Sequence, residues 1–169
     1  MTLRMDITLI KDSTFKLKGK TGFALTDPAG LTLESLDGSN VMKFKTAGEY
    51  EVAGISVIGI KVDENIVFVY EIDGLRICHL GKITKKLSDS KVSSIGDIDV
   101  LLLPVGPESI EMLQQIESYY VIPYGYSTED ELDKFLKDSG FSVEKLSKFS
   151  LKKDDIVEDQ TTEIKVLIN

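Results

Sequence analysis

The sequence contains one cysteine, one histidine and no tryptophan among its 169 residues. One cysteine excludes an internal disulfide and is typical of proteins in a reducing compartment. One histidine with no second cysteine excludes nearly all common zinc sites, because these combine several such residues. The chain also lacks an apolar run near the ~20 residues of a membrane span, and residues 1–20 lack the apolar core of a signal peptide. We therefore expect a cytoplasmic protein with no membrane partner.

Basic residues are outnumbered, with 20 Lys and Arg against 28 Asp and Glu, so the formal net charge is -8. A charge of this sign repels phosphate backbones, and we expect no nucleic-acid partner. The hydrophobic fraction of 42% and the charged fraction of 28% are ordinary for a globular protein. The length suits a single domain over residues 1–169.

Short segments rich in Ile, Leu, Phe and Thr predict strands through the first half of the chain. The strongest signal is the pair of segments 66–72 and 75–80 around Asp73-Gly74. This dipeptide suits a type I′ turn, in which both central residues need positive φ, and it predicts a β-hairpin in a largely antiparallel sheet. Further strands are expected at residues 5–9, 14–18, 22–26, 32–36 and 41–45.

The second half alternates apolar runs with helical patterns. Residues 100–103 and 119–123 are continuous apolar runs, which are typical of inner strands covered on both faces. Helices are expected over residues 86–95, 108–118 and 128–139, with a last strand over 163–168. For the third helix, Thr128 and Glu131 form a capping-box pattern, Ser127 is a rival cap, and Gly140 is a stop signal. The pattern predicts one α/β (α+β) domain, with sheet on sheet at its core and helices outside.

Several stretches, in order along the chain, resemble one family. The longest is IVFVYEIDGLRICHLG at residues 66–81, followed by GDIDVLLLPVG at residues 96–106. Shorter matches lie at residues 5–9, 13–19, 26–28, 47–52 and 121–123. Together they resemble the metallo-β-lactamase superfamily, within it the branch of ascorbate-6-phosphate-lactonase-like "Zn-dependent hydrolases of the β-lactamase fold". The resemblance implies a four-layer αββα sandwich of two mixed sheets with outer helices, shortened here in the first half.

The resemblance also implies which metal ligands to look for. Members of the family hold one or two metals with a His-x-His-x-Asp-His run, a later histidine, a bridging aspartate and a C-terminal histidine, and the metal activates a water. That run has no counterpart here, and the chain is shortened between Pro28 and Ala47, where it would lie. Lys82 stands at the position of the bridging aspartate and Gly125 at that of the C-terminal histidine. We therefore predict no catalytic residue, no metal ligand and no cofactor.

A remnant of the site is expected among seven candidates, which are Asp12, Ser13, Asp27, His79, Lys82, Tyr124 and Tyr126. For His79 we favour a structural role with a hydrogen-bonded ring over a lone metal ligand or a pH-sensitive group. Cys78 precedes it on the same strand and points to the opposite face, so the two cannot readily share an ion. We expect Cys78 to be a small buried hydrophobe.

Two further features have alternative interpretations. Lys82 and Asp12 could form a half-buried ion pair that replaces the positive charge of the metal. Otherwise Lys82 is a solvated member of a cluster with Lys85 and Lys86. Tyr124 and Tyr126 either line a small pocket or pack in the core and at its rim, and we favour packing.

Two functions from different classes remain. The first is a non-catalytic assembly or binding module, whose uncovered edges are buried by another copy or by a protein partner. A variant of this function is the binding of a small anionic ligand by Lys82 and the tyrosines. The alternative is a metal-dependent hydrolase of small esters or phosphorylated sugar lactones with an atypical zinc site. The missing histidines favour the first function and argue against an enzyme.

Overall fold

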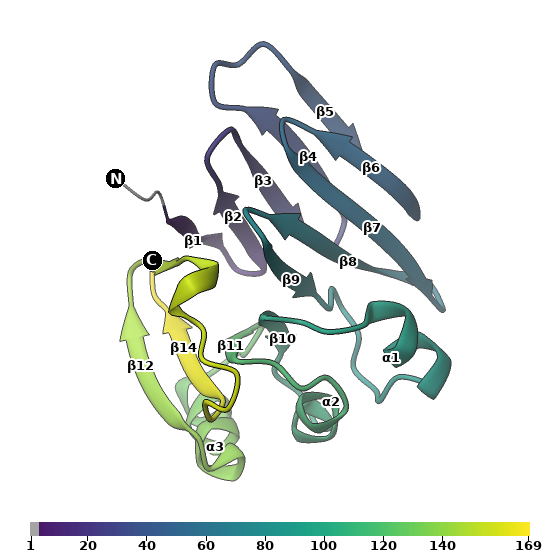
Figure 1. Cartoon of the computed structure of the whole chain (residues 1–169). Helices are drawn as coiled ribbons and strands as arrows, with labels where there is room; N and C mark the ends of the chain where they lie inside the picture. The colour runs from purple at the N-terminus through teal and green to yellow at the C-terminus, as the bar shows by residue number, and fades with distance from the viewer. Residues whose placement is uncertain (1–3) are drawn as a thin grey trace.

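A computed structural model describes residues 4–169 and shows two β-sheets packed face to face (Figure 1). The first sheet has six strands, all antiparallel to their neighbours. Its spatial order is β13 (Phe149–Leu151), β1 (Met5–Lys11), β2 (Thr14–Lys18), β3 (Gly22–Asp27), β4 (Gly30–Ser35) and β5 (Val41–Phe44).

The second sheet has eight strands and is mixed. Its spatial order is β12 (Ser142–Leu146), β14 (Glu163–Leu167), β11 (Tyr120–Tyr124), β10 (Val100–Pro104), β9 (Leu75–His79), β8 (Asn65–Ile72), β7 (Ile55–Val62) and β6 (Gly48–Val52). The pairs from β6 to β9 are antiparallel, whereas those from β9 to β12 are parallel. Parallel neighbours need crossover connections, which is why the helices occur in this half of the chain.

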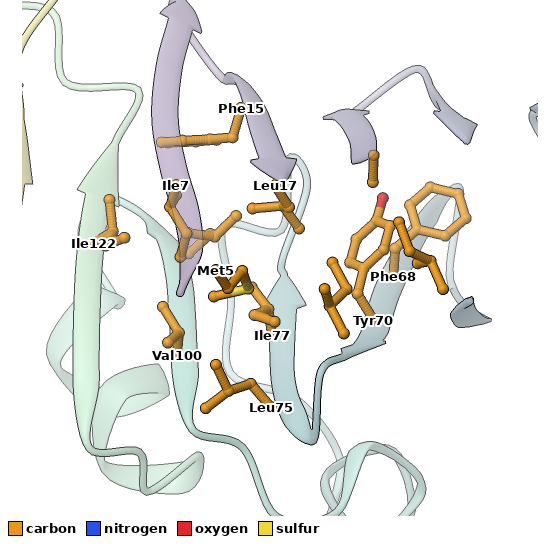
Figure 2. Packing of buried hydrophobic residues seen from close by; sticks show 14 of the residues in the cluster. Met5, Ile7, Phe15, Leu17, Phe68, Tyr70, Leu75, Ile77, Val100 and Ile122 are labelled. Atoms are coloured by element: carbon orange, nitrogen blue, oxygen red, sulfur yellow. The ribbon is translucent and has the colours of Figure 1, made fainter. Parts of the chain in front are cut away.

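The main core lies between the two sheets, where the inward residues of both interdigitate (Figure 2). Met5, Ile7 and Phe15 of the six-stranded sheet face Ile77 and Val100 of the other, and all five are almost fully buried. Strands β2, β3 and β4 of the first sheet alternate between buried and more exposed side chains, because only one face of the sheet is covered.

A second core lies between the eight-stranded sheet and the helices α1 (Asp89–Ile95), α2 (Ser109–Gln115) and α3 (Glu129–Ser139). Ile95, Met112 and Leu132 bury their side chains there. Across residues 4–169 these are the only α-helices, so no helix covers the outer face of the six-stranded sheet. That face carries polar side chains such as Lys16 and Thr32, which need no cover. None of the helices described is long and apolar enough to span a membrane.

The predicted sandwich of two sheets with outer helices is confirmed, and so are its sharpest local signals. Two details of the prediction differ: among residues 4–169 the helices cover only the eight-stranded sheet, and the six-stranded sheet is antiparallel throughout rather than mixed. Asp73 and Gly74 both have positive φ, 52° and 82°, as the predicted hairpin turn requires. The Thr128 hydroxyl caps α3 by accepting from the Glu131 amide, and Gly140 ends the helix in the left-handed conformation. Strands β12 and β13 were not predicted, because their exposed or short segments lack a clear apolar alternation.

Candidate functional site

His79 lies at the end of β9 and is 1% exposed, between the two sheets. Its Nδ1 atom accepts a hydrogen bond of 2.9 Å from the Gly81 amide. Its Nε2 atom lies 2.9 Å from the carbonyl oxygen of Ser13 in the β1–β2 turn. Since Nδ1 is an acceptor, the proton is on Nε2, which donates to Ser13. The ring therefore joins the two sheets through a fixed neutral tautomer, and both of its nitrogens are hydrogen-bonded.

The protonation state of His79 follows from its burial. Loss of solvation lowers its pKa to about 4, while the hydrogen bond to Ser13 and the nearby Asp27 carboxylate oppose this shift only in part. The imidazole is thus neutral at physiological pH. Both of its nitrogens already have partners, so neither has a free lone pair directed at a ligand.

Tyr124, at the end of β11, packs beside this histidine. Its ring centroid lies 4.8 Å from that of His79, and its hydroxyl donates to the carbonyl of Gly81. Phe15 packs edge-on against both rings, with centroid distances of 5.9 Å to His79 and 5.6 Å to Tyr124. Tyr124 is 3% exposed, and burial raises the pKa of its hydroxyl well above the usual range. It is therefore a neutral donor in a filled cluster.

Asp27 lies at the end of β3, and its carboxylate is occupied by local contacts. Oδ2 accepts a hydrogen bond of 2.7 Å from the Thr14 hydroxyl, and Oδ1 accepts one of 2.7 Å from the Ala29 amide. These bonds fix the β3–β4 turn and tie it to β2. Thr14 was missed from the sequence, because a threonine within a strand has no distinguishing pattern.

Asp12 and Lys82 are both exposed, and among the described residues they form no ion pair with each other. The half-buried pair considered from the sequence is therefore wrong. Asp12 occupies the β1–β2 turn with φ of 51°, a conformation that Asp tolerates in tight turns. Lys82 follows Gly81 in a loop and is solvated, as in the simpler interpretation.

The remaining candidates do not join this cluster. Tyr126 packs against the core on the helix side of the eight-stranded sheet, not beside Tyr124. Cys78 also belongs to that second core, which confirms that it points away from His79. Gly125 is exposed and lines a cavity of about 440 Å³ together with Pro107 and Phe135, between α2 and α3. Lys82, Tyr124 and Tyr126 therefore do not form the wall of one pocket.

One buried carboxylate escaped the sequence analysis. Asp99, which precedes β10, is 6% exposed and accepts a hydrogen bond of 2.8 Å from the Arg76 amide. Lys153 reaches the same carboxylate, with Nζ 3.2 Å from Oδ1. These contacts tie β9 and the C-terminal segment to the start of β10. Asp99 could not be identified from the sequence, because an aspartate before a strand has no distinguishing pattern. Its burial in the structure singles it out.

The residues present do not fit the metal that the resemblance implies. Such a site needs several free imidazole or carboxylate donors around one point. His79 has no free nitrogen and Asp27 already accepts two hydrogen bonds. Over residues 4–169, the His, Cys, Asp and Glu side chains form no group of three placed to hold a metal ion. The cluster of Ser13, His79 and Tyr124 holds the sheets together instead.

Comparison with protein families matches residues 25–124 to a family described as "Beta-lactamase superfamily domain". The matched segment runs from within β3 to the end of β11 and includes His79, Lys82 and Tyr124. It therefore covers most of the strands that position the His79 cluster.

Two solved structures are similar. A protein from Thermotoga maritima, provisionally assigned as a Zn-dependent hydrolase of the metallo-beta-lactamase superfamily, is 26% identical with a TM-score of 0.76. The alignment covers 96% of this chain and 98% of that one. A provisionally assigned metal-dependent hydrolase from Parabacteroides distasonis is 12% identical with a TM-score of 0.47, covering 93% and 99% of the two chains. A comparison with curated proteins found no match.

Proposed function

This chain belongs to the beta-lactamase superfamily, and we propose that it is a non-catalytic member that serves as an assembly or binding module. The observation that carries the proposal is the hydrogen bonding of His79. A catalytic imidazole must keep a nitrogen free for a metal or a substrate. Here Nδ1 accepts from Gly81 and Nε2 donates to Ser13, so the only histidine of the chain is committed to structure.

The positions around His79 support the same proposal. Tyr124 and Phe15 fill the space beside the imidazole, so a water or a substrate has no access to it from that side. Lys82, at the position of the family's bridging carboxylate, is a cation and repels a metal ion. A β-sandwich that loses its catalytic site but keeps its fold still has sheet edges and sheet faces that can bind other molecules.

The proposed setting is the cytoplasm. Cys78 is the only cysteine of the chain and is fully buried. Burial raises the pKa of its thiol far above the usual range, so the thiol is neutral and a poor nucleophile. A reducing compartment suits a chain that has no disulfide to form.

Metal content tests the proposal most directly. The protein is purified without chelator, incubated with zinc, manganese or iron, desalted and measured by mass spectrometry. We expect less than about a tenth of an equivalent of each metal, and no rise in melting temperature on metal addition. One or two tightly held equivalents would contradict the proposal. The hydrolase with carboxylate ligands would then take its place, and ester and lactone substrates would be screened.

The variant Asp27→Asn separates specific from adventitious metal. Asp27 was chosen because its carboxylate is close enough to His79 to raise the pKa of the imidazole. If metal is bound in the wild type and is lost in this variant, the ligand set includes Asp27. If traces of metal are equal in both proteins, they are bound elsewhere on the acidic surface.

A further inference from the structure

The outermost strands of the two sheets, β5 and β6, lie side by side at one end of the sandwich (Figure 1). Only residues 45–47 connect them. Within the described chain, β5 pairs with β4 alone and β6 pairs with β7 alone. Each strand therefore presents one unpaired row of backbone N–H and C=O groups, which another β-strand can complete. We call this end of the molecule the β5–β6 edge and define it as residues 41–52.

Apolar side chains are exposed on this edge. Val41 and Met42 are each 50% exposed, although both lie in a strand. Met42 pairs with Leu33, which is fully buried on the core-facing side of the sheet. Met42 therefore points to the core-facing side of its sheet. It remains half exposed because β5 is the outermost strand and no further strand lies beside it. Natural edge strands usually avoid such exposure, because it invites pairing with another chain.

The edge is also held in one shape. The rings of Phe44 and Tyr50 stack across the connection with a centroid distance of 3.9 Å. The Tyr50 hydroxyl donates to the carbonyl oxygen of Thr46 at 2.8 Å. These contacts join β5 to β6, so that both unpaired rows are presented together. A preformed surface loses less conformational entropy on binding than a flexible one.

The charges on the edge differ in sign between its two strands. Lys43 lies on β5 and Lys45 follows it, whereas Glu49 and Glu51 lie on β6, and all four are exposed. The edge therefore carries charges of both signs, so that one copy of it is electrostatically complementary to another copy. When the edges of two copies meet about a two-fold axis, the lysines of each copy can face the glutamates of the other.

From these observations we infer that the β5–β6 edge binds the same edge of a second copy of this chain. The inference rests on the proposed assembly function and names its partner. Backbone hydrogen bonds between edge strands would provide directionality, the burial of Val41 and Met42 would provide stabilisation, and the Lys–Glu pairs would set the register. The edge β12 at the other end of the eight-stranded sheet gives a matched comparison, because it exposes one valine, Val143, by 41%.

The first test compares two identical substitutions by light scattering at micromolar to 100 micromolar concentration. Val41→Asp places a charge on the β5–β6 edge, and Val143→Asp places the same charge on β12. We expect the wild type and Val143→Asp to be dimers, and Val41→Asp to raise the dimer dissociation constant at least about tenfold. Circular dichroism checks that both variants remain folded, which their exposed positions favour. If Val41→Asp dimerises as tightly as Val143→Asp, this interface is excluded.

The second test uses charge. One variant carries Lys43→Glu and Lys45→Glu, which makes the edge wholly acidic, and another carries Glu49→Lys and Glu51→Lys, which makes it wholly basic. We expect each variant alone to be monomeric and their mixture to form a heterodimer that weakens as salt is added. A mixture that stays monomeric while the wild type dimerises would overturn the charge pairing across this edge.

The outcomes distinguish this inference from the proposed function. A monomeric wild type at 100 micromolar overturns the inference, and so does a wild type that binds only a different protein through this edge. Neither result affects the metal content, which tests the non-catalytic proposal separately. Conversely, bound metal in a protein that still dimerises through Val41 would overturn the proposed function and leave the interface in place.

Discussion

The imidazole Nε2 of His79 donates a 2.9 Å hydrogen bond to the carbonyl oxygen of Ser13, across the interface between the two sheets. The two residues are 66 positions apart in the chain, so this bond links β9 of the eight-stranded sheet to the β1–β2 turn of the other. The bond thereby fixes the position of one sheet relative to the other at this end of β9.

Replacing His79 should destabilise the fold. His79→Phe keeps an aromatic ring but leaves the Ser13 carbonyl and the Gly81 amide without their partner. A buried polar group without a partner costs about 1–3 kcal/mol, so we expect the free energy of unfolding to fall by about 3 kcal/mol. Urea denaturation measures it. The control Lys82→Ala, at an exposed residue, should change stability by less than about 0.5 kcal/mol. Equal effects of the two variants would contradict the structural role.

Stability should fall in acid because of the same histidine. Its pKa is about 4 in the folded protein, below the ordinary value of 6.5 that holds in the unfolded chain. The unfolded state therefore takes up the proton first as the pH falls. The contribution of His79 is constant above about pH 6.5 and is lost between pH 6.5 and pH 4, by about 3 kcal/mol in total.

The comparison with His79→Phe isolates this effect from the carboxylates, which also titrate in acid. The difference in unfolding free energy between wild type and variant, measured by urea denaturation from pH 8 to pH 4, should shrink as the pH falls. A difference that is independent of pH would mean that His79 is not buried in its neutral form.

Asp12 and Lys82 should be energetically independent. A double-mutant cycle with Asp12→Asn, which tolerates the positive φ of the turn, and Lys82→Gln should give a coupling energy below about 0.3 kcal/mol. The positive control is the pair of Lys165 and Glu144, whose Nζ and Oε1 atoms lie 2.7 Å apart with the lysine largely buried. That pair should couple by about 1 kcal/mol. A coupling energy of similar size between Asp12 and Lys82 would show that the two residues form an ion pair and would contradict the structure.

The cap of α3 permits a sharp local test. Thr128→Ala removes the hydroxyl that accepts from the Glu131 amide and should lower stability by about 1 kcal/mol. Ser127→Ala should be nearly neutral, because Ser127 contributes its backbone amide to Glu131. Thermal unfolding of the two variants measures this difference. A larger loss of stability in Ser127→Ala than in Thr128→Ala would mean that Ser127, not Thr128, caps the helix.

Much of the local structure was predictable because it depends on neighbouring residues. Asp73-Gly74 forms its turn since both residues accept positive φ, and Thr128 caps α3 since its hydroxyl reaches the helix amides. The short strands β12 and β13 were not predictable from their own residue pattern. They are stabilised by pairing with β14 and β1, which are distant in the sequence or belong to the tertiary arrangement.

For the site, the sequence determined which reactive side chains are available, since the chain has one histidine and one cysteine. It also determined that Cys78 and His79 face opposite sides of a strand, because side chains alternate there. Only the tertiary structure decided which candidates meet: Ser13 and Tyr124 contact His79. The side chains of Asp12 and Lys82 are exposed instead, and Tyr126 packs on the helix side of the sheet. Such contacts join segments far apart in sequence, and their existence depends on strand order and register, which no local pattern encodes.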